Sequence, residues 1–364
     1  MSAAATDSRQ LVLTGGLIHL VHQLAVLTDL PENSERRGAS PRIAVLITGV
    51  LTRDAVALGG LHQAMEAWFA LLRQRDPGQF GGLQLIRREA DLPAGPWDLA
   101  LLNNQWVSGQ RSVVERLGIG ELVVCGDGLG LYYRCARELR ALLPSLLNRP
   151  IPEPGRRVRY VLSGRQPAWH RPPQAAATAP SAERARLFAL LVESQRPQAA
   201  AAVVLALDAS APERPLWLCS VPNLAHQFPG RHIPQAVLED WRRRLERRHG
   251  FDPGRDRLLL IDHPKAPPNG SFGPLQRPWL AGPLRSAVAL EVLVQLLRER
   301  CGERRIVVAG LTSALYGVRQ LTGAEVAWLH LAPLWHGNPL YRRRPLEFLH
   351  RWLRVVRMAR LTGP

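Results

Sequence analysis

The stretch Arg257-Leu258-Leu259-Leu260-Ile261-Asp262-His263-Pro264-Lys265 decides how the second half of the chain is interpreted. Its four consecutive apolar residues, 258–261, predict a buried strand of a parallel sheet. The strand should end at the His263-Pro264 step, because proline cannot donate a hydrogen bond to a neighbouring strand. Residues 266–274 (APPNGSFGP) are turn formers. A histidine and a lysine are therefore expected at the carboxyl end of a buried strand, the edge where open α/β sheets bind ligands.

Lys265 is the only lysine among 47 basic residues, and the net charge of the chain is +17 at pH 7. Such a charge attracts anions, whether nucleic acid, anionic lipid, or phosphorylated and acidic substrates. No nucleic-acid partner is expected, because the aromatic residues are not interleaved with the arginines and no recognised nucleic-acid motif is present. The remaining classes of partner are small anionic substrates and anionic membrane surfaces.

Length and composition predict a globular protein with two domains. The chain has 364 residues, of which 46% are hydrophobic and 21% charged. Its four cysteines have no metal-ligand spacing, and Cys125 and Cys219 lie in apolar runs, so buried free thiols and a reducing cytoplasm are expected. Residues 1–10 lack a signal-peptide pattern, and no apolar run reaches the roughly 18 residues that span a bilayer. A cytoplasmic location is expected, with at most peripheral attachment to the inner membrane face.

The order of apolar patterns predicts an α/β fold with alternating strands and helices. In the first half, strands are expected at 10–14, 43–47, 83–86, 97–102 and 121–125, and helices at 17–27, 54–73, 107–117 and 132–147. The proline- and alanine-rich segment 164–180 is interpreted as a linker or surface loop. In the second half, helices are expected at 181–194, 233–249, 284–300, 311–321 and 346–358, and strands at 200–207, 216–221, 257–261, 305–309 and 325–331. This pattern predicts two Rossmann-like domains, 1–180 and 181–364, with the last helix folding back.

Two of the predicted strand ends carry candidate acid–base residues. Asp127 lies between two glycines after the strand 121–125, where a carboxylate can act as a general base. The alternative is that Asp127 only stabilises the turn or caps a helix. His263 can donate a hydrogen bond or a proton to a departing phosphate if an anion lies between it and Lys265. The alternative is a structural histidine at a strand end.

Anion- and ribose-binding residues are predicted at one helix start, on one apolar helix stretch and at one glycine turn. Thr312 and Ser313 begin a helix after the strand 305–309, where hydroxyls and free N–H groups bind anions or simply cap the helix. Glu291 lies on an otherwise apolar helix stretch and is expected to meet a ribose hydroxyl or an arginine. Gly15-Gly16 follows the first strand but does not complete a GxGxxG pattern, so no dinucleotide is expected. No P-loop, HExxH or Asp-x-Asp motif is present, and neither a metal nor another cofactor is expected.

Three short motifs in this order, Gly126-Asp127-Gly128, His263-Pro264 and Thr312-Ser313, resemble those of the bacterial sialyltransferases of the two-Rossmann (GT-B) type. That family has an acidic-acidic-glycine motif in its N-terminal domain, an HP motif in its C-terminal domain and a later Ser-Ser/Thr motif. The resemblance is nearest to the lipooligosaccharide sialyltransferase and capsule polysialyltransferase group. The three motifs and the predicted strands and helices that carry them span residues 10–335, and the resemblance lies in the motifs and their order. Glycine replaces the first acidic residue at position 126, and the third motif reads Thr-Ser-Ala.

The resemblance implies a single inverting displacement without a metal. Asp127 would take the proton of an acceptor hydroxyl as CMP leaves the anomeric carbon of sialic acid, or of a related acidic sugar. On the donor side, His263, Pro264 and Lys265 would lie at the departing phosphate. Thr312 and Ser313 would bind the same phosphate, and Glu291 would bind the CMP ribose. Gly15, Gly16 and Gly128 would lie on the acceptor or cleft side. Base and acid would come from different domains, so closure of the cleft would assemble the site.

The resemblance also gives the basic residues a use, because acceptors of such enzymes are lipid-linked or acidic glycans. The arginines at 242–244, 247–248 and 342–344 and the last helix would face anionic headgroups, and the alternative is a solvated surface produced by coding bias. Three other functions stay open. They are a GT-B transferase that uses a UDP- or ADP-sugar, a non-catalytic basic binding protein, and a degenerate transferase that binds glycans without turnover.

Overall fold

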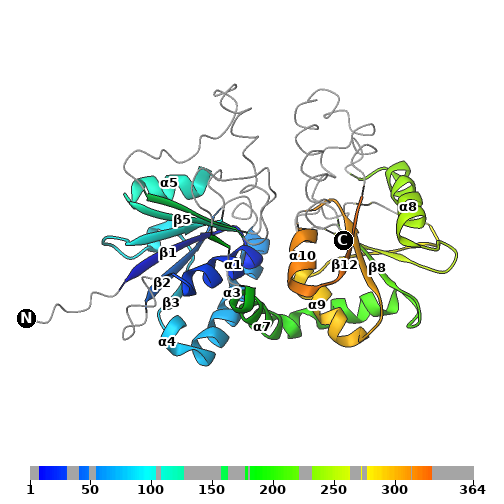
Figure 1. Ribbon diagram of the computed structural model, residues 1–364, viewed down its shortest axis with the longest axis horizontal. Coiled ribbons are helices and arrows are strands. Elements are labelled where there is room, and N and C mark those ends of the chain that lie inside the picture. Colours follow the sequence, from blue (N-terminus) through cyan, green and yellow to red (C-terminus); the bar gives the residue numbers. More distant parts are fainter. Residues whose placement is uncertain are drawn as a thin grey trace, which may run out of the picture. The chain divides into compact units, whose positions relative to one another are not determined.

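The computed structural model describes residues 8–30, 41–48, 55–103, 108–126, 157–162, 177–178, 181–220, 232–262, 272, 277–312 and 314–329. The chain divides into two compact units, Met1–Gln195 and Arg196–Pro364. The division falls inside the long helix α7 (Ser181–Asp208), whereas the sequence places it just before that helix. Figure 1 shows each unit as a sheet accompanied by helices.

The first unit is built on a sheet of parallel strands in the order β3-β2-β1-β4-β5-β6-β7. Its strands are β1 (Arg9–Thr14), β2 (Arg42–Ile47), β3 (Leu83–Ile86), β4 (Leu99–Leu102), β5 (Glu121–Gly126), β6 (Arg157–Leu162) and β7 (Ala177–Thr178). Besides α7, its helices are α1 (Leu17–Thr28), α3 (Ala55–Arg75), α4 (Pro77–Phe80), the 3-10 turn η2 (Glu89–Asp91) and α5 (Ser108–Arg116). The strand order reverses between β1 and β4, so the switch point where doubly wound sheets bind ligands lies there.

Helix α1 is fastened to that switch point by a buried glutamine. The Nε2 of Gln23 donates to the Leu13 carbonyl of β1 at 2.9 Å and to the Leu101 carbonyl of β4 at 3.3 Å. Ten of the twelve residues of α1 are buried, which explains why its sequence is apolar on nearly every side. The start of α1 is therefore held at the carboxyl edge of the sheet.

The second unit has a smaller parallel sheet in the order β10-β9-β8-β11-β12. Its strands are β8 (Leu216–Ser220), β9 (Leu258–Ile261), β10 (Leu280–Leu284), β11 (Ile306–Gly310) and β12 (Glu325–Trp328). Its helices are α8 (Gln235–His249), α9 (Leu290–Cys301) and α10 (Ala314–Thr322). The strand order reverses between β8 and β11, so the second unit repeats the arrangement of the first.

The two faces of the second sheet are covered by different helices (Figure 1). Helix α8 buries Val237, Leu238, Trp241 and Leu245 in a core that also contains Trp217 of β8 and neighbouring residues of β9, β11 and β12. Helices α9 and α10 lie on the other side of the sheet and contact each other. The three inner strands β8, β9 and β11 are consequently buried on both faces, as the apolar sequence of β9 predicted, whereas the edge strands β10 and β12 are partly exposed.

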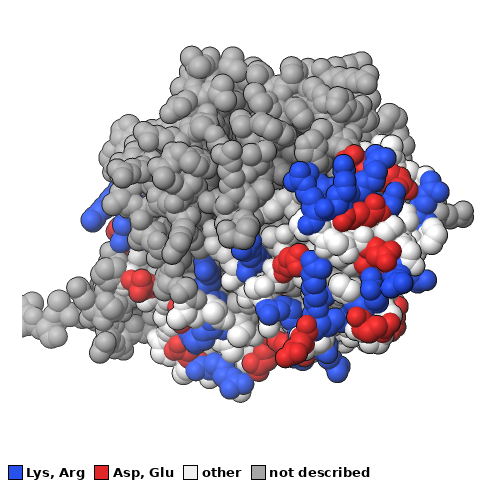
Figure 2. Space-filling view, turned by 45° about the vertical axis from the view of Figure 1, so that its right-hand side comes forward, with Lys and Arg blue, Asp and Glu red and all other residues white. Residues whose placement is uncertain are grey.

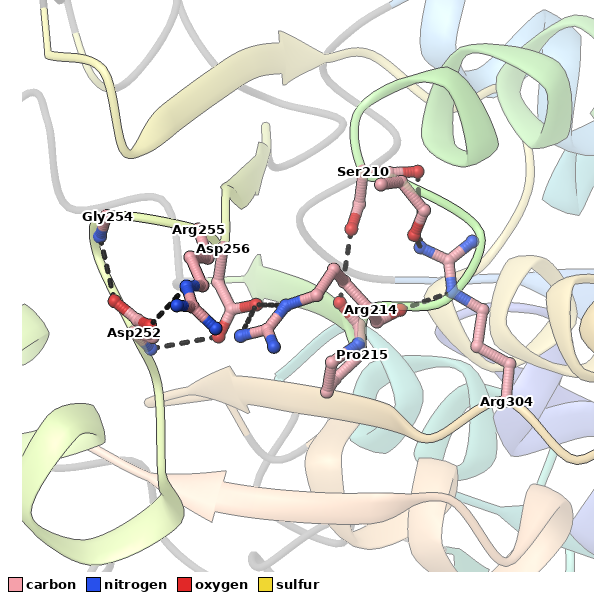
Figure 3. A network of polar contacts seen from close by, with 9 residues as sticks. Ser210, Arg214, Pro215, Asp252, Gly254, Arg255, Asp256 and Arg304 are labelled. Carbon is pink, nitrogen blue, oxygen red and sulfur yellow. Dashed lines mark hydrogen bonds and ion pairs between the residues drawn. The ribbon is translucent and has the colours of Figure 1, made fainter.

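Arginine contacts tie together the amino edge of the second sheet (Figure 3). Arg214, just before β8, donates to the buried carboxylate of Asp256, just before β9, at 2.9 Å and 2.8 Å. The other carboxylate oxygen of Asp256 accepts from the Asp252 backbone N–H at 2.9 Å. Arg304, just before β11, donates to the carbonyls of Arg214 at 2.6 Å and Ala211 at 2.7 Å. These polar contacts stabilise the amino edge of the sheet. The ligand is expected at the opposite, carboxyl edge.

The predicted elements are mostly confirmed, with two errors in the second half. Residues 200–207 are not a strand but part of α7, which continues through Pro197. The alanines there favour a helix, and the buried positions 199, 202, 203 and 206 have helical spacing. The helix expected at 284–300 begins only at Leu290, because Leu280–Leu284 forms the edge strand β10, where a proline is tolerated. Strand β6 was not predicted, and the helices expected at 132–147 and 346–358 lie outside the described residues.

No helix within the described ranges is both long enough and apolar enough to cross a membrane.

Candidate functional site

The residues predicted for the site divide into those the structure describes and those it does not. Gly15, Gly16, Glu291 and Thr312 are described, and all four lie at the carboxyl edge of a sheet or at the start of a helix that follows it. The others lie outside the described residues: Asp127, Gly128, His263, Pro264, Lys265 and Ser313. The chain nevertheless places Asp127 directly after β5 and His263 two residues after the end of β9.

Glu291 lies in the first turn of α9 and is buried, with 4% of its surface exposed. A carboxylate is favoured there by the positive end of the helix dipole. A Cβ atom added to Gly317 of α10 would lie 2.7 Å from Glu291 Oε1. The carboxylate therefore packs against the α10 backbone, in space that the missing side chain of Gly317 leaves open.

Thr312 caps helix α10. Its Oγ1 accepts from the Ala314 backbone N–H at 3.2 Å, and its carbonyl accepts from the Leu315 N–H at 3.2 Å. Capping is the alternative that the sequence left open for this residue. A capping hydroxyl keeps its own proton, so it can still donate a hydrogen bond to a phosphate oxygen placed at the helix start.

The switch point of the second sheet requires glycine at position 310. Gly310 ends β11 opposite Ser220, the last residue of β8, and a Cβ atom on Gly310 would overlap the Ser220 carbonyl oxygen. The Leu329 N–H donates to the Gly310 carbonyl at 3.0 Å, which ties β12 to the same edge. The absent side chain thus lets three strand ends meet just before Thr312.

Gly310→Ala is expected to lower the free energy of unfolding by about 3 kcal/mol, because overpacking against a backbone carbonyl cannot be relieved by a rotamer change. Urea denaturation followed by circular dichroism measures this. Gly120→Ala is the matched control, since no heavy atom lies within 4 Å of its added Cβ. Equal stabilities of the two variants would show that the β8–β11 edge adjusts at no cost.

Asp262 and Arg285 form an ion pair at the same edge that sequence reasoning did not select as functional. Asp262, directly before His263, is buried, and its Oδ2 lies 3.6 Å from the Nε of Arg285. The Asp262 N–H donates to the Leu284 carbonyl at 2.9 Å. The sequence did contain a signal, because a carboxylate directly after four apolar strand residues needs a cationic or N–H partner when it is buried.

In the first unit, Gly15 and Gly16 form the turn between β1 and α1. The Thr14 hydroxyl donates to the Gly16 carbonyl at 3.0 Å and accepts from the Gly16 N–H at 3.4 Å. Asn103 follows β4 on the other side of the switch point and accepts a hydrogen bond from Gln110 through its Oδ1. Neither Asn103 nor Gln110 was predicted from the sequence, because a single amide has no motif around it.

The basic face of α8 is partly neutralised within the unit. The helix has five arginines and three acidic residues. Arg242 pairs with Glu239 and Glu246, Arg243 pairs with Asp240 at 3.6 Å, and Arg244 donates to the Trp328 carbonyl. Figure 2 shows arginines interspersed with carboxylates on the face it draws. Attachment of this helix to an anionic membrane stays a prediction.

Within the described ranges, no group of three or more histidine, cysteine or acidic side chains could hold a metal ion. Cys125 and Cys219 are buried free thiols, as predicted, and burial raises the pKa of Cys219 to about 12.

The carboxyl edge of the second sheet brings together the capped start of α10, the buried Glu291 and Arg285, and these groups suit a phosphate and a ribose. Comparison of the chain with protein-family models, curated proteins and solved structures finds no match.

Proposed function

We propose that this protein is an inverting, metal-independent glycosyltransferase of the two-Rossmann (GT-B) type. It moves sialic acid, or a related acidic sugar, from a CMP-activated donor to a hydroxyl of a glycan or glycolipid. One observation carries the proposal. Glu291, predicted to bind ribose, packs against Gly317 of α10, the helix whose start Thr312 caps and where the phosphate is predicted to bind.

That contact supports a nucleotide site, because two donor-binding residues 21 positions apart in sequence (291 and 312) belong to helices that touch each other. Glu291 accepts hydrogen bonds from the ribose hydroxyls. Thr312, Ser313 and the first N–H groups of α10 hold the phosphate, with the helix dipole favouring its negative charge. Arg285, which is half exposed and lies 3.6 Å from Asp262 Oδ2, adds a cation at the same edge.

The reacting groups follow from the motifs. Asp127 removes the acceptor proton, and His263 stabilises or protonates the departing phosphate, with Pro264 ending the strand and Lys265 adding charge. Gly15, Gly16 and Gly128 lie on the acceptor side. Histidine, lysine, arginine and a helix start together offset the charge of the leaving group, so the mechanism needs no metal.

Calorimetric titration of the full chain with CMP, UDP and ADP tests the donor. We expect CMP to bind at least about tenfold more tightly than either of the others, since a site that hydrogen-bonds one base leaves polar groups unpaired with another. Tight UDP or ADP binding with no response to CMP would favour the alternative transferase. No binding of any nucleotide would leave only a non-catalytic binding protein.

Gly317→Ala should separate stability from nucleotide binding. The added Cβ, 2.7 Å from Glu291 Oε1, displaces the carboxylate, and we expect CMP affinity to fall about tenfold, the loss of one charge-assisted hydrogen bond. Helix propensity favours alanine by about 1 kcal/mol and offsets part of the cost of moving the buried carboxylate, so the free energy of unfolding should change less than in Gly310→Ala. Gly59→Ala is the matched control, because Gly59 is an exposed glycine on α3 with open space around its added Cβ. Unchanged CMP affinity in Gly317→Ala would remove Glu291 from the nucleotide site.

A further inference from the structure

The switch point of the first unit brings a fixed amide donor next to a glycine turn. Asn103 follows β4, and its backbone N–H donates to the Leu13 carbonyl of β1 at 3.3 Å. A Cβ atom added to Gly15 would lie 3.4 Å from Asn103 Nδ2, so the amide is turned toward the β1–α1 turn. Asn103 is 6% exposed.

The orientation of this amide is set by Gln110, which is fully buried and donates its Nε2 hydrogen to Asn103 Oδ1. The oxygen of Asn103, 3.7 Å from the same added Cβ of Gly15, is thereby occupied, and Nδ2 remains as the donor beside this turn. Within the described ranges, Nδ2 makes no hydrogen bond to another residue. An oxygen atom of a bound ligand could accept the hydrogen bond that Nδ2 of Asn103 is able to donate.

The start of α1 lies beside the same turn. Its first intrahelical hydrogen bond runs from the Leu20 N–H to the Gly16 carbonyl, so the preceding N–H groups have no acceptor within the helix. No side chain caps this end, and no acidic residue lies in the first turn. A 12-residue helix therefore directs its uncompensated positive end toward the turn that Asn103 faces.

Thr48 supplies a second, independent indication of a ligand. It follows β2, and its N–H donates to the Thr14 carbonyl at 2.8 Å, one residue before Gly15. The side chain is 8% exposed, and its Oγ1 has no hydrogen-bond partner in the described part of the chain. A buried hydroxyl without a partner is destabilising, whereas a ligand oxygen at this edge would satisfy it.

We propose that Gly15, Gly16, Thr48 and Asn103 form an oxyanion site, which binds a phosphoryl or carboxylate group of a ligand at the start of α1. The two groups share the chemistry that the site recognises, oxygens that accept from an amide, a hydroxyl and helix N–H groups. The site belongs to the first unit alone and involves no residue of the proposed donor site. It shares Gly15 and Gly16 with the acceptor side of the proposed transferase, but anion binding is measured without turnover, so its failure and the failure of sialyl transfer are distinguishable.

The test uses the full-length protein labelled with 15N-asparagine. The side-chain amide resonance of Asn103 is assigned by its absence in Asn103→Asp. Inorganic phosphate and acetate are titrated separately, and we expect the Asn103 amide to shift in a saturable manner with at least one of them. The responding anion identifies the group as phosphoryl or carboxylate. No shift of this resonance with either anion would overturn the proposal.

Thr48→Val distinguishes binding from structure, because valine keeps the shape of the side chain and removes the hydroxyl. We expect about tenfold weaker anion binding at Asn103, the loss of one hydrogen bond to a charged group, with a melting temperature that is not lowered. Thr28→Val is the matched control, since Thr28 lies at the far end of α1 and its hydroxyl donates to the Ala25 carbonyl. Equal anion affinity in Thr48→Val and the wild type would also overturn the proposed site.

Discussion

Arg214→Ala is expected to lower the free energy of unfolding by about 3 kcal/mol, the lower end of the range for removing one partner of a buried ion pair. The carboxylate of Asp256 has no exposed surface and accepts both Arg214 contacts, so its charge would remain buried with a single backbone N–H donor. The backbone carbonyl of residue 214, which accepts from Arg304, is kept in the variant, so the change reports the loss of the arginine side chain. Urea denaturation followed by circular dichroism measures the change.

Two further variants make this prediction specific. Arg255→Ala removes a neighbouring arginine that is 75% exposed and lies 3.7 Å from Asp252, and its effect should stay within about 0.5 kcal/mol because exposed ion pairs contribute little. The double variant Arg214→Met with Asp256→Leu should recover most of the loss, because no unpaired charge remains. If Arg214→Ala and Arg255→Ala had equal effects, burial of Asp256 would not be what makes this edge sensitive.

Asp127→Ala and His263→Ala are each expected to reduce release of CMP from CMP-sialic acid, in the presence of a glycan acceptor, by about 10²- to 10⁴-fold, the usual contribution of a general acid or base. The residue before Asp127 is Gly126, at the end of β5, so Asp127 alone can act as the base in this motif. His263 follows Asp262, whose backbone and side chain are both held at the end of β9. Each substitution removes one proton-transferring group and leaves the strand before it intact.

Binding and turnover should separate in these variants. Asp127→Ala should bind CMP like the wild type, because the base acts on the acceptor, and Asp208→Ala, at the exposed end of α7, serves as the control with full activity. Undiminished CMP release in either Asp127→Ala or His263→Ala would remove that residue from the mechanism. A wild-type protein that binds CMP-sialic acid but releases no CMP would instead indicate the degenerate, glycan-binding alternative.

The elements that the sequence predicted best are those with a continuous local pattern. Strand β9 and the turn after β1 could be located within a residue or two, because four apolar residues before His-Pro and two glycines before an apolar helix are local signals. Residues 200–207 were predicted to form a strand, yet alanine propensity and one-sided burial continue α7 through Pro197 to Asp208. Strand β10 contains a proline and exists through its pairing with β9 at the edge of the sheet.

The sequence by itself determined the alternation of strands and helices, the burial of two thiols and the placement of Thr312 at a helix start, because each depends on neighbours a few residues away. Only the tertiary structure decided which distant residues meet. The contact of Glu291 with Gly317, the closure of the amino edge by Arg214 and Asp256, and the Asn103 amide beside Gly15 all join segments that are far apart in the chain or on different elements. Strand order creates these contacts, and hydrophobic burial fixes strand order over the whole sheet rather than within any local pattern.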